Sequence, residues 1–92
     1  MEYEIDVCTA DVGKIIRFYR VVEEDKVLGV YEISEEEYSE INRLLSGKGY
    51  KSYQTKILSL HSYCFTYYDV DSGTVKEITG KFGKLIPKGG GK

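Results

Sequence analysis

The chain has 92 residues, of which 41% are hydrophobic and 30% are charged, and its formal net charge is −2 at pH 7. This balance is typical of a folded globular domain and excludes an intrinsically disordered chain. A chain of this length has room for one small core and little room for a deep catalytic cleft. We therefore expect a single compact domain over residues 1–80, followed by a Gly- and Lys-rich tail over residues 81–92.

The N-terminal residues and the longest apolar run predict the cellular compartment, and the compartment predicts whether the cysteines are thiols or a disulfide. Met1 to Glu4 is acidic rather than basic, and polar side chains interrupt the longest apolar run, residues 57–70. We therefore expect neither a secretory signal nor a membrane span, and we expect a cytoplasmic location. In that compartment Cys8 and Cys64 are expected to be buried thiols and not a disulfide.

The first third of the chain predicts three strands. Polar and apolar residues alternate over residues 2–8, which predicts a half-buried strand with Asp6 among the acids on its polar face. Residues 15–22 and 27–33 are rich in β-branched and aromatic side chains and flank a short polar run. They predict an antiparallel hairpin.

The clearest local signal in the sequence is the start of a helix. Ser34 is followed three residues later by Glu37, which matches a capping box. Three consecutive glutamates occupy the first turn, where the helix dipole favours negative charge, so their position explains them without any catalytic role. Apolar residues follow at helical spacing up to Gly47. We predict a helix over residues 35–46.

The stretch over residues 50–68 contains no glycine or proline and is too long for one strand. We expect it to break around Ser59, His61 and Ser62, and a short helix over residues 52–60 is an alternative.

The remaining elements complete a sheet. Residues 62–69 predict a strand, residues 71–73 a hairpin loop, and residues 74–79 a returning strand. The expected fold is therefore α+β, with one mostly antiparallel sheet of five to six strands and a single helix packed on it, in the order βββ-α-βββ. A helix of about 12 residues is about 18 Å long and 10 Å wide, whereas such a sheet is about 24–29 Å wide. We expect part of the sheet to stay uncovered.

Tyrosine is the unusual component, with nine tyrosines and no tryptophan. Tyrosine is enriched at interfaces, although it is also a favoured strand residue. Residues 1–47 carry a net charge of −7 (12 acids, 5 bases) and residues 48–92 a net charge of +5 (3 acids, 8 bases). The expected binding residues are four tyrosines and two lysines of the glycine-rich segment: Tyr53, Tyr63, Tyr67, Tyr68, Lys81 and Lys84.

Catalytic and metal sites lack support in the sequence. His61 and Cys64 are three residues apart, which places them on opposite faces of a strand. One histidine and two distant cysteines do not form a zinc set. Residues 69–73 match the start of a calcium loop only in part, and the position of its bidentate glutamate is Gly80. We expect no catalytic residue, no metal and no cofactor.

Three functions remain open. The first is a non-enzymatic protein that binds and blocks or sequesters a partner protein, as small phage and mobile-element proteins that inhibit host defence systems do. The second is an oligomeric binder of a small anionic ligand such as a nucleotide, with subunit interfaces supplying the pocket. The third is a single-stranded nucleic-acid binder whose aromatic residues stack on bases, although the negative net charge argues against it.

Overall fold

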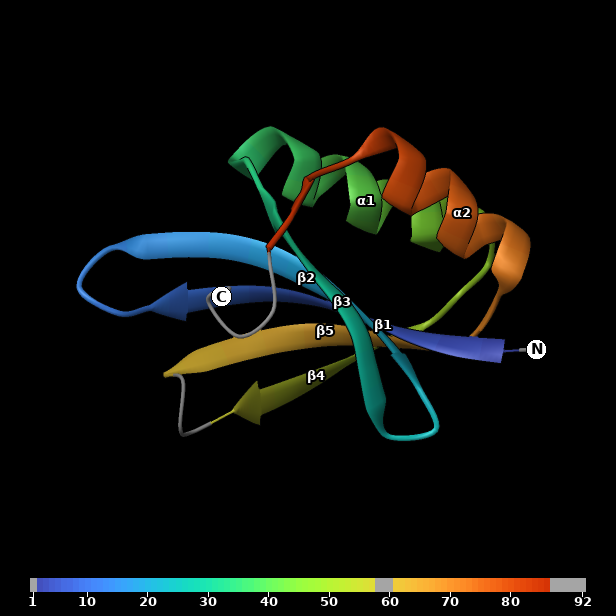
Figure 1. The fold of residues 1–92 in the computed structure, drawn as a ribbon, viewed down its shortest axis with the longest axis horizontal. Coiled ribbons are helices and arrows are strands. Elements are labelled where there is room, and N and C mark those ends of the chain that lie inside the picture. The colour runs from blue at the N-terminus through green and yellow to red at the C-terminus, as the bar shows by residue number, and fades with distance from the viewer. Residues whose placement is uncertain (1, 58–60, 87–92) are drawn as a thin grey trace.

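The computed structural model describes residues 2–57 and 61–86. Six strands form one antiparallel sheet in the order β4-β5-β1-β2-β3-β6, and two helices accompany it (Figure 1). In chain order the elements are β1 (Glu2–Asp11), β2 (Ile15–Glu23), β3 (Lys26–Ile33), α1 (Glu35–Gly47), β4 (Ser52–Ile57), β5 (Ser62–Asp71), α2 (Ser72–Lys81) and β6 (Lys84–Leu85). The α+β class and the antiparallel sheet are as predicted, whereas the second helix is not.

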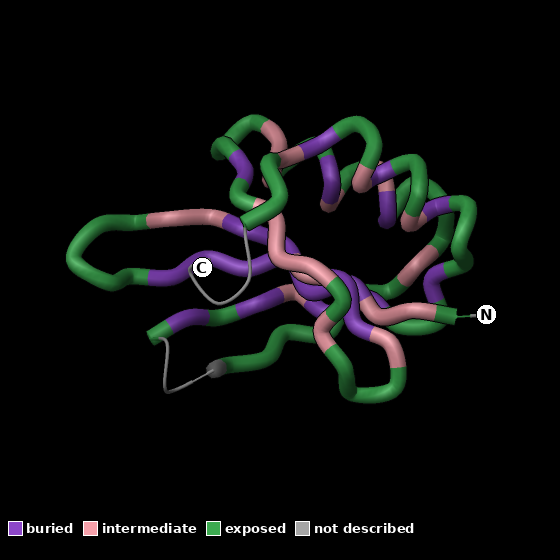
Figure 2. Tube along the Cα trace, in the orientation of Figure 1, coloured by how far each residue is buried: buried purple, intermediate pink, exposed green. Residues whose placement is uncertain are grey.

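Both helices lie on the same face of the sheet (Figure 1). The main core forms between them and the sheet, where Ile41 and Leu45 of α1 and Ile78 of α2 meet the inner side chains of the central strands. Figure 2 shows buried positions concentrated on the central strands and on the inner turns of the helices. The helices thus bury one face of the sheet and leave the opposite face without a helix among the described residues.

Two hairpins set the register of the first three strands. The strands β1 and β2 pair directly from Glu4 opposite Val22 to Asp11 opposite Ile15. The turn between β2 and β3 has only two central residues, Glu24 and Asp25, with φ of 49° and 67°. Two successive left-handed residues match the type I′ turn, whose twist suits a two-residue hairpin. The predicted hairpin over residues 15–33 is therefore confirmed.

The predicted capping box at the start of α1 is also confirmed. The backbone N–H of Glu37 donates to Ser34 Oγ at 3.1 Å, and the backbone N–H of Ser34 donates to Glu37 Oε1 at 2.9 Å. These two bonds satisfy backbone donors that a helix start leaves without an intrahelical partner.

Replacing Ser34 with alanine is expected to lower the free energy of unfolding by about 0.5–2 kcal/mol, because the side-chain acceptor for the Glu37 N–H is lost. Chemical denaturation measures the change. Ser39→Ala, in the same helix and exposed, is the matched control and should leave stability within about 0.5 kcal/mol. Equal denaturation midpoints for the two variants would show that the cap does not stabilise this helix.

The predicted hairpin loop over residues 71–73 and strand over residues 74–79 are wrong, because α2 occupies this stretch. Asp71 is the N-cap, and its Oδ1 accepts the backbone N–H of Thr74 at 2.7 Å. An Asp followed by Ser and Gly suits a helix start as well as a turn. Burial decides between them, since the helix places Thr74 and Ile78 on one buried face.

The sequence predicts a tail over residues 81–92, whereas the structure packs residues 81–86 with the helices and the sheet. Lys81 ends α2, the buried Phe82 side chain joins the main core, and residues 84–85 form β6 at the edge of the sheet beside β3. Gly83 has φ of 81°, and a Cβ there would lie 3.0 Å from the carbonyl oxygen of Glu32. Glycine is therefore required where the chain turns from α2 into β6. Residues 87–92 lie outside the described residues.

The expected break between residues 50 and 68 is bounded by the end of β4 at Ile57 and the start of β5 at Ser62. Ser59 lies outside the described residues, whereas His61 is exposed just before β5. Most of the alternative helix over residues 52–60 is excluded, because residues 52–57 form a strand.

The expectation of two buried thiols is wrong in one respect. Cys8 and Cys64 are both fully buried, but they form a disulfide between β1 and β5. The two residues stand directly opposite each other in the register of these neighbouring strands. The sequence separation of 56 residues hid this pairing from sequence analysis.

Within residues 2–57 and 61–86, no helix is long and apolar enough to cross a membrane.

Candidate interaction surface on the open face of the sheet

We call the sheet surface opposite the helices the open face. Because side chains alternate along each strand, the pairing register defines its members. They are Glu4, Asp6, Cys8 and Ala10 of β1, Ile16, Phe18, Arg20 and Val22 of β2, Val27, Val30 and Glu32 of β3, Tyr53 and Thr55 of β4, and Ser62, Cys64, Thr66 and Tyr68 of β5.

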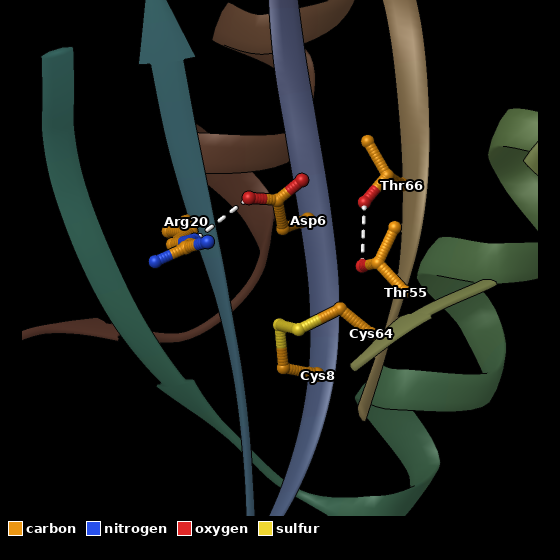
Figure 3. Close-up of polar contacts among 6 residues, drawn as sticks. All are labelled: Asp6, Cys8, Arg20, Thr55, Cys64 and Thr66. Carbon is orange, nitrogen blue, oxygen red and sulfur yellow. Dashed lines mark hydrogen bonds and ion pairs between the residues drawn. A yellow bond between two sulfur atoms is a disulfide. The ribbon is translucent and has the colours of Figure 1, made fainter. Parts of the chain in front are cut away.

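A small second core lies at the centre of the open face. The disulfide packs with Ala10 and Phe18, and the partly buried side chains of Ile16 and Val30 pack against this cluster. Next to it, the hydroxyls of Thr55 and Thr66 lie 3.3 Å apart on the neighbouring strands β4 and β5 (Figure 3). The centre of this face is therefore rigid and largely filled by its own side chains.

A buried ion pair adjoins this cluster. Arg20 Nε donates to Asp6 Oδ2 at 2.7 Å, and the two residues are direct cross-strand partners on β1 and β2 (Figure 3). Asp6 is only 1% exposed, so the predicted solvent-facing position of this acid is wrong. Its second oxygen, Oδ1, has no hydrogen-bond partner among the described residues and points along β1 away from the disulfide.

Glu4 lies beside that unpartnered oxygen, two residues earlier on the same face of β1. Burial raises the pKa of Glu4 to about 7, and the neighbouring Asp6 carboxyl adds to the rise. A protonated Glu4 can donate to Asp6, which satisfies the buried acceptor. Near neutral pH the two carboxyls and Arg20 therefore form a cluster that holds or releases one proton.

Tyr53 and Tyr68 are the exposed aromatic residues of the open face. Their side chains are 53% and 47% exposed, and their ring centroids lie 5.6 Å apart. Tyr68 stands beside an irregularity of β5, because Ile5 pairs with Tyr67 whereas Tyr3 pairs with Val70. The extra residue makes a β-bulge, a feature that redirects side chains at sheet edges. Two of the predicted binding tyrosines are thus brought together on one surface.

The other two predicted tyrosines lie elsewhere. Tyr67 is buried in the main core, and its hydroxyl donates to Asn42 Oδ1 at 2.6 Å. Burial raises the pKa of Tyr67, as expected for a phenol held away from water. Tyr63 is 40% exposed but points to the helix side of the sheet, where its ring packs edge-on against Phe65. The structure therefore buries Tyr67 in the main core and places Tyr63 on a different surface from Tyr53 and Tyr68.

The predicted lysines lie at a groove of about 570 Å³ near the start of α1, which Lys81, Lys84 and Gly83 line together with Glu37. The backbone N–H of Gly83 donates to Glu37 Oε2 at 3.0 Å. The bonds from Ser34 and Gly83 lower the pKa of Glu37 and keep it charged. The glycine-rich segment thus already holds an anion, which is a carboxylate of this chain.

Sequence analysis missed the roles of Asp6, Arg20 and Glu4. The signal was present, because a tight connection between residues 11 and 15 fixes the hairpin register and sets Asp6 opposite Arg20. Among the described residues, no three His, Cys, Asp or Glu side chains are arranged to hold a metal ion.

The chain has no significant match to a protein-family model, a curated protein sequence or a solved structure. Functional inference therefore rests on the geometry of the open face.

Proposed function

We propose that this chain is a non-enzymatic interaction module that binds a partner protein through the open face of its sheet. The observation that carries the proposal is the pair Tyr53 and Tyr68, two half-exposed aromatic residues whose rings lie together on a sheet face that neither α1 nor α2 covers. Tyrosines of this kind are frequent anchors of protein interfaces, because they bury large apolar area and keep one polar group.

The edge of the sheet supports the same surface. The strand β4 is the outermost strand beside β5, and its residues 52–56 are all exposed. An unpaired edge offers backbone donors and acceptors to an extended partner segment, while Tyr53 supplies a side-chain contact. An aromatic pair beside a free edge is therefore suited to holding a peptide segment.

Replacing Tyr53 and Tyr68 together with serine is expected to weaken partner capture at least about tenfold, because an aromatic residue that acts as an interface hot spot contributes about 2 kcal/mol or more. The immobilised protein is compared with the variant in an extract of the cells that express it. Tyr63→Ser is the matched control, since Tyr63 is similarly exposed on the other side of the sheet. The proposal fails if every protein captured by the wild type is captured equally by the double variant.

No specific observation favours the other two functions, an anionic-ligand binder and a single-stranded nucleic-acid binder. The anion-binding groove is occupied by Glu37, and the open face carries the acidic pair Glu4 and Asp6, which disfavours a nucleic-acid backbone. A thermal shift with nucleotides tests the first alternative, and a steep salt dependence of oligonucleotide binding tests the second. The narrower expectations, a host defence protein as partner and a homo-oligomer, stay predictions.

The cytoplasmic location also stays a prediction, and the disulfide provides its test. A reducing cytosol normally keeps such a pair as thiols. Free thiols are alkylated in intact cells, and the mass of the protein is then measured by mass spectrometry. The mass shows whether Cys8 and Cys64 are thiols or a disulfide. A disulfide in all molecules would favour an oxidising compartment.

A further inference from the structure

An acidic pocket lies at one end of the open face, where the start of β1, the β2–β3 turn and the end of β5 meet. Its volume is about 150 Å³, and its lining consists of four acids, two tyrosines and one valine: Glu2, Glu4, Glu24, Asp69, Tyr3, Tyr68 and Val22. A cavity of about this volume takes a group of the size of benzene. The pocket is therefore suited to one side chain rather than to a whole ligand of drug size.

A buried acceptor lies next to Glu4, one of the residues that line the pocket. Asp6 is 1% exposed, and its Oδ1 has no hydrogen-bond partner among the described residues. This oxygen points along β1 away from the disulfide (Figure 3), and Glu4 of the pocket lining lies two residues before Asp6 on the same face of β1. An unpaired buried carboxylate oxygen is unfavourable until a donor reaches it. Because Arg20 is one cation beside the two carboxyls of Glu4 and Asp6, a deprotonated Glu4 leaves this group with a negative charge, which favours a further cation beside Glu4.

We propose that this pocket receives an arginine side chain of the partner protein, with the guanidinium on the carboxylates of Glu4 and Asp69 and against the ring of Tyr68. The inference rests on the proposed interaction function and names the chemistry of the partner. Arginine fits better than lysine, because its planar fork bonds carboxylates in pairs and stacks on aromatic rings. The acids of the rim attract a basic segment to the same place.

The proton on Glu4 makes binding depend on pH. The charged and titratable groups around Glu4 are Asp6 on β1, Arg20 on β2, Glu24 and Asp25 in the β2–β3 turn, Asp69 on β5, and Glu2. The arginine binds the charged carboxylate of Glu4 and so competes with its proton, which means that it binds the deprotonated site. Since the pKa of Glu4 is about 7, affinity should rise by up to about tenfold between pH 6 and pH 8.

The test uses a small probe, so that it does not require the partner. N-acetyl-arginine methylamide is titrated into the isotope-labelled protein at constant ionic strength and followed by backbone NMR at pH 6 and pH 8. We expect saturable shifts confined to the amides around Glu4, Glu24 and Tyr68, with tighter binding at pH 8. The matched neutral probe, N-acetyl-citrulline methylamide, should produce no such shifts.

Two variants locate the effect. Glu4→Gln keeps a donor for Asp6 but never becomes charged, so it should weaken binding about tenfold at pH 8 and abolish the pH dependence. Asp69→Asn removes a charge while keeping a residue that tolerates the left-handed φ of 58° at this position. Glu40→Gln, an exposed glutamate on α1, is the control and should bind like the wild type.

The inference is overturned if citrulline shifts the same amides as arginine, if the shifts map elsewhere, or if Glu4→Gln binds as tightly as the wild type at pH 8. Probe binding combined with unimpaired partner capture by the Tyr53 and Tyr68 variant would keep the cation site and reject the proposed function. Absence of probe binding combined with lost capture would reject the cation site and keep the function.

Discussion

Replacing both Cys8 and Cys64 with alanine is expected to lower the free energy of unfolding by about 4 kcal/mol. The disulfide joins residues 56 positions apart, and closing a loop of that length removes much of the conformational entropy of the unfolded chain. Native domains are stable by only about 5–15 kcal/mol in total, so this is a large part of the stability of a 92-residue chain. The disulfide also ties β5 to the centre of the sheet.

Guanidinium denaturation of the oxidised wild type, the reduced wild type and the double alanine variant measures the effect. The reduced wild type separates loss of the cross-link from loss of the two buried sulfur atoms, because it retains both thiols. We expect the oxidised protein to unfold at the highest denaturant concentration and the two other samples to unfold close together. Coincident curves for the oxidised and reduced wild type would contradict a stabilising disulfide.

Replacing Arg20 with methionine is expected to destabilise the protein by about 3 kcal/mol. The Asp6 carboxylate then stays buried without its cation, and breaking a buried pair by removing one partner commonly has an effect of about 3–5 kcal/mol. We expect the lower end of that range, because the Arg20 side chain keeps 27% of its surface exposed and is partly screened by water. Methionine retains most of the apolar length of the arginine, so the change mainly removes charge and hydrogen bonds.

Two further variants show whether the unpaired charge is the cause. Asp6→Asn in the Arg20→Met background removes the uncompensated charge and should restore much of the lost stability. Arg17→Met is the matched control on the same strand, where the guanidinium lies 5.4 Å from the centre of the Tyr38 ring on the helix side. That contact is expected to contribute about 0.5–1 kcal/mol. A similar loss for Arg17→Met and Arg20→Met would show that the buried pair has no special role.

The open face connects stability with the proposed function. The disulfide joins β1 to β5, and the pair Asp6 and Arg20 joins β1 to β2, so both stiffen the strands that carry Glu4 and Tyr68. A binding surface on a rigid sheet loses little conformational entropy when a partner docks. Variants that remove the disulfide should therefore be tested for partner capture as well as for stability.

The sequence by itself determined the features that depend on neighbouring residues. The capping box at Ser34 and Glu37 follows from a spacing of three residues, and the hairpin over residues 15–33 follows from alternation around a polar turn. The comparison of helix and sheet dimensions predicted an uncovered sheet surface. These conclusions depend on local geometry, which short stretches of chain specify.

Only the tertiary structure decided the features that depend on distant segments. Asp71 begins either a turn or a helix by local chemistry, and it begins α2 because Ile78 and Phe82 then enter the main core. Cys8 meets Cys64 only through the pairing of β1 with β5, and the same pairing separates the exposed Tyr68 from the buried Tyr67. Local pattern determines the elements with strong sequence signals. Burial and strand order decide the ambiguous segments and which side chains meet, because apolar surfaces from distant segments gain free energy when they leave water together.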